Sequence, residues 1–360
     1  MALKNFSAQH ILFKGLLLPF SIVYGIAISI RNSLYSTGLL KSVAFNIPVI
    51  GIGNLCVGGA GKTPHVEYFI RLLSPYLNIG VLSRGYNRNS KGFRLVASRD
   101  NARTVGDEPM QYFYKFKPIS VAVSESRSLG IPLMLGRKPE INLILLDDSY
   151  QHRSVTPYIN ILLTAYDDLF TNDFILPAGR LREWPSASSR ADIIIVSKCP
   201  EDLSNDSAED IKTKIQVKDQ QKIFFSYYRY GNPYNLNTGV FTNLSSFEEV
   251  VLICAIASEE YLLSYLVNNV QVVHTMIFED HHYFSHTELN ELKKLYSSVE
   301  NSRKAILTTE KDATRLVLQR QELNNLGIEI YVLPIFVEFL FNKGAELNDL
   351  IRNDLLSFKV

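Results

Sequence analysis

Cysteine is scarce in this chain of 360 residues, which has only Cys56, Cys199 and Cys254. The number is odd and no two are closely spaced, so the sequence excludes a disulfide framework and a cysteine-based zinc site. An excess of one charge is also missing, because 37 Lys and Arg face 36 Asp and Glu. The formal net charge of +1 argues against a protein held to nucleic acid by bulk positive charge. What remains is a globular composition, 46% hydrophobic and 20% charged, long enough for about two domains.

A long apolar run occupies residues 11–30, which is about the length of a membrane-crossing helix. On a helical wheel, Lys14, Ser21, Gly25 and Asn32 fall on one narrow polar stripe. Positive residues flank or interrupt the run, namely Lys4, Lys14, Arg31 and Lys41. We expect a helix that lies in a membrane interface with its apolar side among the acyl chains. A spanning helix and a buried core helix are the alternatives, and the lack of a clear cleavage site disfavours a secretory signal.

From residue 47, continuous apolar runs alternate with helix-like segments, which predicts an α/β fold with a parallel sheet covered on both faces. The predicted strands are 48–53, 78–83, 120–124, 141–147, 159–164 and 193–197, and the predicted helices are 63–73, 108–116 and 127–135. A charged stretch, 201–221, is typical of a surface helix. A second α/β unit follows, with strands at 250–255, 272–278, 304–308 and 328–333 and helices at 258–268 and 287–299.

Between the two units, the runs 223–230 and 239–242 flank a turn-rich segment and predict a two-stranded connector. We therefore divide the chain into five parts: a membrane-associated N-terminal helix (1–35), a core domain (36–220), a β-ribbon linker (221–245), a smaller α/β domain (246–340) and a C-terminal helix (341–360).

The clearest chemical motif is a glycine-rich loop between a predicted strand and a predicted helix, which makes the core domain a P-loop NTPase fold. It consists of Gly58, Gly59, Ala60, Gly61, Lys62 and Thr63. Glycines allow backbone N–H groups to surround phosphate oxygens, and the helix N-terminus adds a favourable dipole. Lys62 is expected to reach the β- and γ-phosphates of ATP, and the Thr63 hydroxyl to coordinate Mg²⁺. The strict pattern has glycine where this chain has Cys56.

Acidic residues supply candidates for the metal and for proton transfer. Asp147 and Asp148 end an apolar strand, where either carboxylate can hold Mg²⁺. Asp107 and Glu108 open a helical segment, as a cap, a base or a metal ligand. His281 and its neighbour His282 precede a capping box in a loop that follows a strand.

Arginines near these acids offer planar guanidinium groups that suit phosphate. Arg84 follows a predicted strand, and Arg180 and Arg182 lie in a segment rich in turns. As isolated residues, each would be a solvated surface side chain.

Taken together, several strings occur in an order that resembles the tetraacyldisaccharide 4′-kinase family, the lipid A kinases. They are GIGNLCVGGAGKTP, SRGY, GDEP, LLDDSYQHR, LPAGRLRE, VSKCP, FEDHHYFS and TTEKDATRL. The resemblance implies ATP-dependent phosphorylation of the 4′-hydroxyl of a tetraacylated glucosamine disaccharide 1-phosphate, at the cytoplasmic face of the inner membrane of a Gram-negative bacterium. The product would be lipid IVA. No nucleic acid or protein partner is implied.

The resemblance also assigns roles to residues. Asp107 would be the catalytic base and His281 its dyad partner across a cleft between two lobes that close on ATP. Lys62 and Thr63 would hold phosphates and Mg²⁺, with Asp147, Asp148 and Glu108 at the metal. Arg84, Arg180, Arg182 and His152 would bind substrate. The chain departs from the family pattern at Cys56, at Ser149–Tyr150 and at Trp184.

An apolar N-terminal helix is also what this chemistry needs, since exposing acyl chains to water costs about 0.8 kcal/mol per methylene. Two rival classes fit less well. A partitioning-type membrane ATPase carries an additional lysine early in the loop, where this chain has Val57. A GTPase requires Asn/Thr-Lys-x-Asp, and the segment Ser197–Pro200 lacks the final aspartate.

Overall fold

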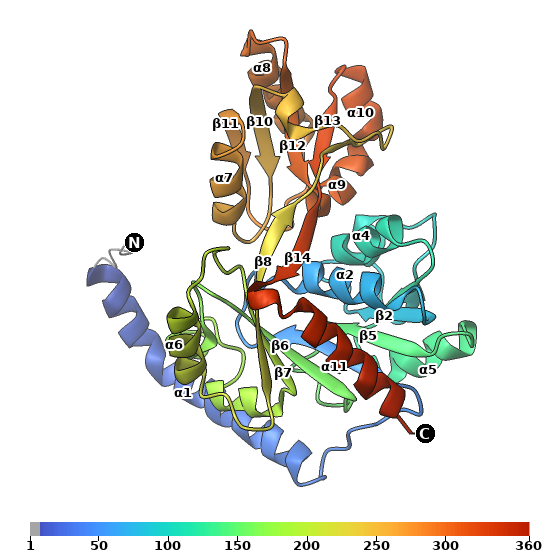
Figure 1. Cartoon of the computed structure of the whole chain (residues 1–360), viewed down its shortest axis with the longest axis vertical. Helices are drawn as coiled ribbons and strands as arrows, with labels where there is room; N and C mark the ends of the chain where they lie inside the picture. The colour runs from blue at the N-terminus through green and yellow to red at the C-terminus, as the bar shows by residue number, and fades with distance from the viewer. Residues whose placement is uncertain (1–7, 360) are drawn as a thin grey trace.

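The computed structural model describes residues 8–359, with side chains from residue 15 onward, and it contains two β-sheets in two lobes (Figure 1). Lys4 therefore lies outside the described residues. The larger sheet has nine strands in the order β14-β8-β7-β6-β1-β5-β2-β4-β3. Its strands are β1 (Val49–Asn54), β2 (Ile79–Ser83), β3 (Arg94–Leu95), β4 (Ser120–Val123), β5 (Leu143–Asp147), β6 (Ile159–Ala165), β7 (Ile193–Ser197), β8 (Lys222–Tyr230) and β14 (Ile335–Phe339).

The larger sheet is parallel from β8 to β4, with an antiparallel strand at each edge. Its central strands β1, β5 and β7 are buried along their whole length, because helices cover both faces. One face packs against α2 (Lys62–Leu73), α4 (Asp107–Lys115) and α11 (Gly344–Ser357). The other face packs against α5 (Arg127–Arg137) and α6 (Asn205–Ile215). A short helix, α3 (Ala102–Val105), directly precedes α4. The α/β prediction is confirmed. The predicted surface helix 201–221 is present as α6, which is shorter and covers only Asn205–Ile215.

The smaller sheet has five strands in the order β11-β10-β12-β13-β9, parallel except for β9. The strands are β9 (Tyr234–Asn235), β10 (Glu249–Cys254), β11 (Gln271–Ile277), β12 (Lys304–Thr309) and β13 (Ile330–Leu333). Its helices are α7 (Glu260–Val267), α8 (His286–Ser298), α9 (Glu310–Leu316) and α10 (Arg320–Asn325). The second α/β unit of the sequence analysis is therefore present, with α9 and α10 in addition.

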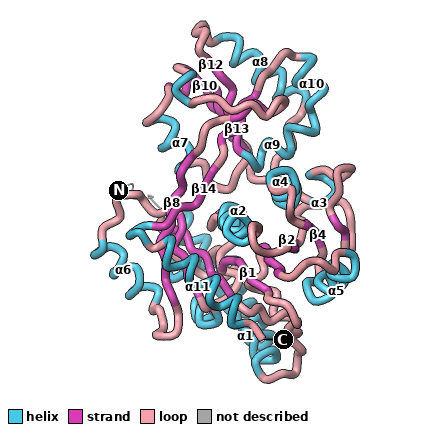
Figure 2. The backbone as a smooth tube through the Cα atoms, turned by 45° about the vertical axis from the view of Figure 1, so that its right-hand side comes forward, coloured by secondary structure: helices cyan, strands magenta, loops and turns pink. Residues whose placement is uncertain are grey.

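The predicted two-stranded linker between the lobes is present, but its second strand is not the predicted one. Segment 239–242 is not a strand of the ribbon, and β8 instead pairs with β14, which lies more than 100 residues later in the chain. The predicted partner was wrong because 239–242 was chosen for its nearness in sequence, whereas β14 returns from the second lobe and completes the larger sheet. The two crossing segments β8 and β14 are visible between the lobes in Figure 1, and α2 lies between β14 and α4 in Figure 2.

Helix α1 (Ala8–Ser36) docks on the larger lobe through its polar stripe. The Ser21 hydroxyl accepts a hydrogen bond from the Ala178 amide at 2.9 Å, and Asn32 donates to Glu183 at 2.6 Å. Gly25 lies directly against the Trp184 ring. The opposite side of the helix is exposed and apolar, at Leu16, Phe20, Ile22, Val23, Ile26 and Ile30. The window Gly15–Ser36 is long and apolar enough to cross a membrane, and only 11% of it is buried in the protein.

This docking predicts the effect of a side chain at Gly25. A Cβ there would come within 2.3 Å of the Trp184 ring, so Gly25→Ile should weaken α1 docking by about 1–3 kcal/mol, the usual cost of overpacking. The measurement is the rate of tryptic cleavage after Arg31 in detergent, which should rise because Arg31 is held by the Gln151 carbonyl only while α1 is docked. Gly15→Ile is the control, since a Cβ at Gly15 meets nothing within 4 Å. Equal cleavage of the two variants would contradict the docking interpretation.

Candidate active site

The glycine-rich loop leaves β1 at Asn54 and enters α2 at Lys62, in the centre of the larger sheet. Gly61 has φ +81°, and a Cβ there would lie 2.0 Å from the Tyr228 hydroxyl, so glycine is required. The Ser197 hydroxyl donates to the Ala60 carbonyl at 2.9 Å and anchors the loop to β7. Lys62 Nζ donates to Asn54 Oδ1 at 3.1 Å and lies 3.8 Å from Asp148. The loop thus has the strand-to-helix geometry of a phosphate site.

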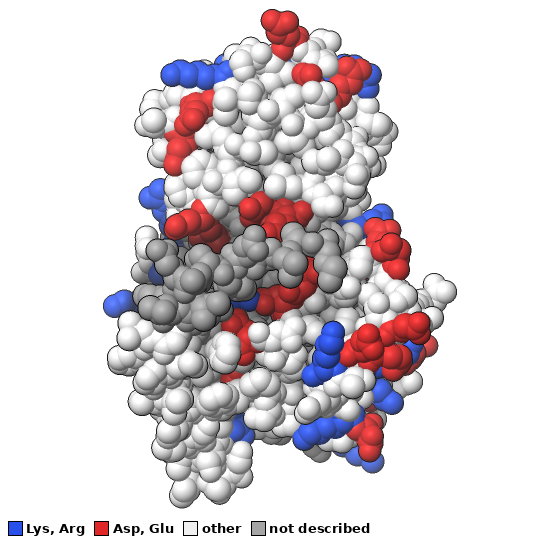
Figure 3. Space-filling model, turned by 90° about the vertical axis from the view of Figure 1, so that its left-hand side faces the viewer, with Lys and Arg blue, Asp and Glu red and all other residues white. Residues whose placement is uncertain are grey.

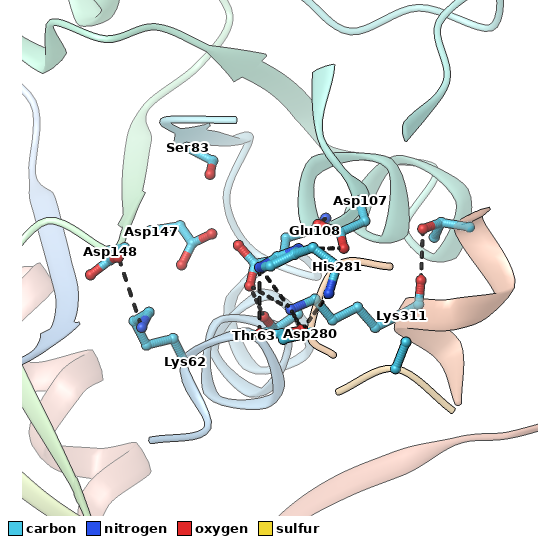
Figure 4. A network of polar contacts seen from close by, with 12 residues as sticks. Lys62, Thr63, Ser83, Asp107, Glu108, Asp147, Asp148, Asp280, His281 and Lys311 are labelled. Carbon is cyan, nitrogen blue, oxygen red and sulfur yellow. Dashed lines mark hydrogen bonds and ion pairs between the residues drawn. The ribbon is translucent and has the colours of Figure 1, made fainter. Parts of the chain in front are cut away.

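Asp147 ends β5, the strand next to β1, and Asp148 follows it, but their environments differ sharply (Figure 4). Asp147 is fully buried, and burial, followed by the charges of Glu108 and Asp148, raises its pKa to about 7. Its Oδ1 has no hydrogen-bond partner among the described residues. Burial alone would also raise the pKa of Asp148, but Lys62 and Arg182 outweigh it and hold that pKa well below its usual range. Asp147 is therefore the carboxylate whose burial is not offset by the nearby cations Lys62 and Arg127.

Asp107 begins α4 in the larger lobe and meets the smaller lobe directly. His281 Nδ1 lies 2.8 Å from Asp107 Oδ2, and the same oxygen accepts a hydrogen bond from Arg315. Burial would raise the pKa of Asp107, but the hydrogen bond from His281 and the charges of Lys311 and Arg315 hold it well below its usual range. His281 itself has φ +65°, a conformation uncommon for a non-glycine residue. The structure brings together the two residues that the sequence analysis paired across the lobes.

Lys311 links the contact of Asp107 with His281 to the phosphate loop. Its ammonium lies 3.0 Å from Asp280 Oδ1 and 3.7 Å from Glu108 Oε1. Glu108 in turn accepts a hydrogen bond from the Thr63 hydroxyl at 3.2 Å. Burial lowers the pKa of Lys311, but Glu108, Asp107 and Asp280 more than reverse this, so the ammonium stays charged. A continuous polar network therefore connects Thr63, on the P-loop helix, to α9 of the smaller lobe (Figure 4).

Lys311 and Arg315 were not among the predicted site residues. Their string, TTEKDATRL, entered the sequence analysis only as part of a family pattern. A local signal was present, because Thr309 caps α9 by accepting a hydrogen bond from the Asp312 amide, directly after β12. Helices that begin at the carboxyl end of a strand commonly carry functional residues in α/β lobes. Which way their side chains point depends on how the lobes meet, and local sequence does not contain that information.

The predicted substrate-binding residues lie in different surroundings. Arg182 donates to both oxygens of Asp148, whereas Arg180 pairs with Asp168 and Asp173 and is half exposed. Arg84 is exposed, two residues before Tyr86, whose ring lies 4.9 Å from the His281 ring. For His152, burial, followed by the charges of Arg127 and Arg84, lowers the pKa to about 4. Arg182 therefore belongs to the P-loop network, and the charge of Arg84 acts on Arg127 and His152.

A cavity of about 850 Å³ opens beside the phosphate loop, between the two lobes. Gly58 and Gly59 line one side, the ends of β6 and β7 line another, and Tyr261 and Tyr265 of α7 close it from the smaller lobe. Its rim is acidic, with Asp167, Asp168, Glu201, Asp202, Glu259 and Glu260. Acidic side chains also gather at the waist of the molecule in Figure 3. Lys198, which directly follows β7 and is partly buried, also lines this cavity.

The donor set at the phosphate loop fits Mg²⁺. The unpartnered Asp147 Oδ1, the Thr63 hydroxyl and the Glu108 carboxylate are all hard oxygen donors. Within residues 8–359, no group of three His, Cys, Asp or Glu side chains is arranged to hold a metal alone. Magnesium in phosphoryl-transfer sites usually takes one or two protein ligands and completes its shell with phosphate and water. The residues present are therefore compatible with a metal that arrives with the nucleotide.

Comparison with known proteins gives a consistent result. Residues 13–355 match a family model described as tetraacyldisaccharide-1-P 4′-kinase. A tetraacyldisaccharide 4′-kinase of Bacteroides thetaiotaomicron is 40% identical over 344 residues, covering 92% of this chain and 90% of that protein. A protein of the same name from Flavobacterium psychrophilum is 44% identical, covering 91% and 93%. The crystal structure of LpxK from Aquifex aeolicus in complex with ATP superposes with a TM-score of 0.73 and 29% identity, covering 95% of this chain and 99% of that chain.

The P-loop helix also carries a buried histidine whose titration affects stability. Burial lowers the pKa of His65 to about 4, from an ordinary value of 6.5, despite its hydrogen bond with the Gly61 carbonyl. The unfolded chain therefore binds this proton before the folded chain does, and the free energy of unfolding falls as the pH drops from about 6.5 to 4. His65→Gln removes the titrating side chain and with it this pH dependence. The free energy of unfolding of the wild type minus that of the variant should therefore fall by roughly 3 kcal/mol between pH 7.5 and pH 4.

The measurement is denaturant unfolding of both proteins at a series of pH values. The control is His274→Gln, at a partly exposed histidine on β11. A difference between wild type and His65→Gln that does not vary with pH would show that His65 does not titrate in this way.

Proposed function

The chain belongs to the tetraacyldisaccharide 4′-kinase family, and from this premise we propose how its residues transfer the γ-phosphoryl group of ATP to the 4′-hydroxyl of a lipid A precursor. As a kinase of lipid A biosynthesis, it acts on an acylated glucosamine disaccharide 1-phosphate. The partitioning-type ATPase is not favoured, since the match to the kinase family runs over residues 13–355.

The triphosphate would lie on the loop from Gly58 to Thr63, with Lys62 against its terminal phosphates. In a parallel α/β sheet, ligands bind at the carboxyl ends of the strands, and the 850 Å³ cavity lies at the ends of β6 and β7 next to this loop. We therefore assign the nucleoside of ATP to this cavity, with Tyr261 as an aromatic wall. Lys198 would lie between the nucleoside and Gly59, since a Cβ built on Gly59 would be 3.6 Å from its Nζ.

Asp147 and Thr63 would hold Mg²⁺, with Glu108 beside them. The unpartnered, buried Asp147 oxygen supports this assignment over Asp148, which is already neutralised by Lys62 and Arg182. When bound, the metal would neutralise charge on the β- and γ-phosphates. Asp148 would instead keep Lys62 and Arg182 oriented toward the phosphate loop.

The observation that carries the proposal is the contact between Asp107 and His281, 2.8 Å across the junction of the lobes. The carboxylate of Asp107 would accept the proton of the sugar hydroxyl, while the contacts of His281 and Arg315 with Oδ2 fix its orientation. Its pKa is low, which makes it a weak base, but the loose transition state of phosphoryl transfer demands little proton removal before bond formation. Positioning therefore contributes more than basicity here.

The acceptor would approach from a lipid surface that α1 contacts. The exposed apolar side of α1 faces away from the protein, and its polar stripe contacts the larger lobe. This arrangement supports a peripheral or monotopic association with the inner membrane, on its cytoplasmic face where ATP is present.

Replacing the base tests the assignment directly. Asp107→Asn should lower kcat for lipid phosphorylation by about 10²- to 10⁴-fold, the usual contribution of a general base, and leave ATP binding intact because no P-loop residue changes. The measurement combines transfer of labelled phosphate to the acylated disaccharide with a separate titration of ATP binding. Asp210→Asn, at an exposed position on α6, is the control and should keep full activity. Wild-type turnover by Asp107→Asn would remove Asp107 from the mechanism.

Membrane association is tested by charge on α1. Phe20→Glu and Val23→Glu place a carboxylate on the exposed apolar side, 63% and 68% exposed respectively, where transfer into the acyl region is strongly unfavourable. Each variant should sediment less with vesicles of anionic phospholipid. Val267→Glu, at an equally exposed valine on α7, should sediment like the wild type. Unchanged sedimentation of the α1 variants would argue for another membrane contact.

A further inference from the structure

Helix α4 carries a second charged side chain into the junction of the lobes, at the end opposite Asp107. Lys115 Nζ lies 2.7 Å from Glu67 Oε2 and 2.6 Å from both oxygens of Glu310. Glu67 is fully buried and Glu310 nearly so. Two buried carboxylates from different lobes therefore share one ammonium, which is the arrangement expected of a structural link rather than of a surface ion pair.

The three partners come from elements that the phosphoryl transfer uses. Glu67 lies on α2, four residues after Thr63, and is held further by Gln111 at 2.9 Å and by Arg71 at 2.9 Å. Glu310 is the first residue of α9 and accepts a hydrogen bond from the Ile335 amide at 3.2 Å, where β14 begins. One ammonium thus joins the P-loop helix, the helix of Asp107, α9 and the returning strand of the linker, which Figure 2 shows around α2.

Lys115 and Asp107 are the last and first residues of α4, about 12 Å apart along a helix of this length. At one end, Asp107 and Glu108 contact Arg315 and Lys311 of α9; at the other end, Lys115 contacts Glu310 of α9. Helix α9 is therefore attached to α4 at two separated points. A single attachment would allow α9 to rotate about it, whereas two fix its orientation.

We propose that Lys115 is a positioning residue for phosphoryl transfer, whose contacts with Glu67 and Glu310 hold α9 so that Lys311 and Arg315 meet Glu108 and Asp107. The inference rests on the proposed role of Asp107. It adds a residue that touches neither nucleotide nor lipid and that acts through the orientation of α9.

Lys115→Met tests the proposal in the full-length protein. It should lower kcat for lipid phosphorylation roughly 10- to 100-fold, the effect expected when a catalytic group is displaced by about 1 Å. The KM for ATP should stay at the wild-type value, because the phosphate loop is untouched. Lys115→Arg, which keeps the charge and the reach, should restore most of kcat. Lys117→Met, two residues further on and exposed, is the matched control and should behave as the wild type.

A second variant separates positioning from stability. Lys115→Met leaves Glu67 and Glu310 facing each other, and burial together with Glu67 already raises the pKa of Glu310 to about 7. Adding Glu310→Gln removes this conflict while Glu67 keeps Arg71, so the double variant should regain melting temperature over Lys115→Met. Its kcat should nevertheless stay low, because the attachment is still missing.

Two results would overturn the proposal: a wild-type kcat for Lys115→Met, or a kcat of the double variant that recovers in step with its melting temperature. Asp107→Asn, measured in the same series, distinguishes failure of the positioning role of Lys115 from failure of the base role of Asp107. If Asp107→Asn is inactive while Lys115→Met is fully active, only the positioning role fails. If Asp107→Asn is active, the proposed base fails on its own evidence.

Discussion

The contact between the two lobes depends on the buried carboxylate of Asp107. It is almost completely buried, and its interactions with His281 and Arg315 come entirely from the smaller lobe. Arg315 is itself held by Asp312 and by the Ala255 carbonyl, so its charge faces two carboxylates. Breaking a buried pair of this kind by removing one partner typically costs 3–5 kcal/mol. The contacts of Asp107 with His281 and Arg315 therefore favour the arrangement of the lobes in which these three residues meet.

Two adjacent aspartates at the end of β5 have opposite properties because their backbones direct them to different surroundings. Asp148 has φ +47°, which turns it away from the direction of the strand and toward Lys62 and Arg182. Asp147, the last strand residue, stays buried next to Tyr112, whose hydroxyl donates to it at 3.2 Å. Lys62 and Arg182 therefore neutralise Asp148, whereas Asp147 keeps a buried oxygen without a hydrogen-bond partner among the described residues.

Much of this arrangement follows from local sequence, because the phosphate loop, the continuous apolar strands and the polar stripe of α1 are each encoded within a few residues. The stripe also marks the docked side of α1, although the sequence did not show that Ser21, Gly25 and Asn32 contact the segment 178–184 of the larger lobe. The pairing of β8 with β14 was not predictable in this way, since it joins residues more than 100 positions apart. Lys311 and Arg315 were missed for the same reason, as their partners are on the other lobe.

The placement of α1 also constrains how lipid and nucleotide meet. Tyr24 of α1 donates to the Arg182 carbonyl, and the Arg182 side chain contacts Asp148 and Asn54 at the phosphate loop. The segment that binds the helix is therefore also the segment that contacts the P-loop network. If α1 is held in a membrane as proposed, its docking contacts would keep the phosphate loop at a fixed depth below the lipid surface. The larger lobe would then govern the approach of the sugar hydroxyl to the γ-phosphate, and the smaller lobe would supply the residues that orient Asp107.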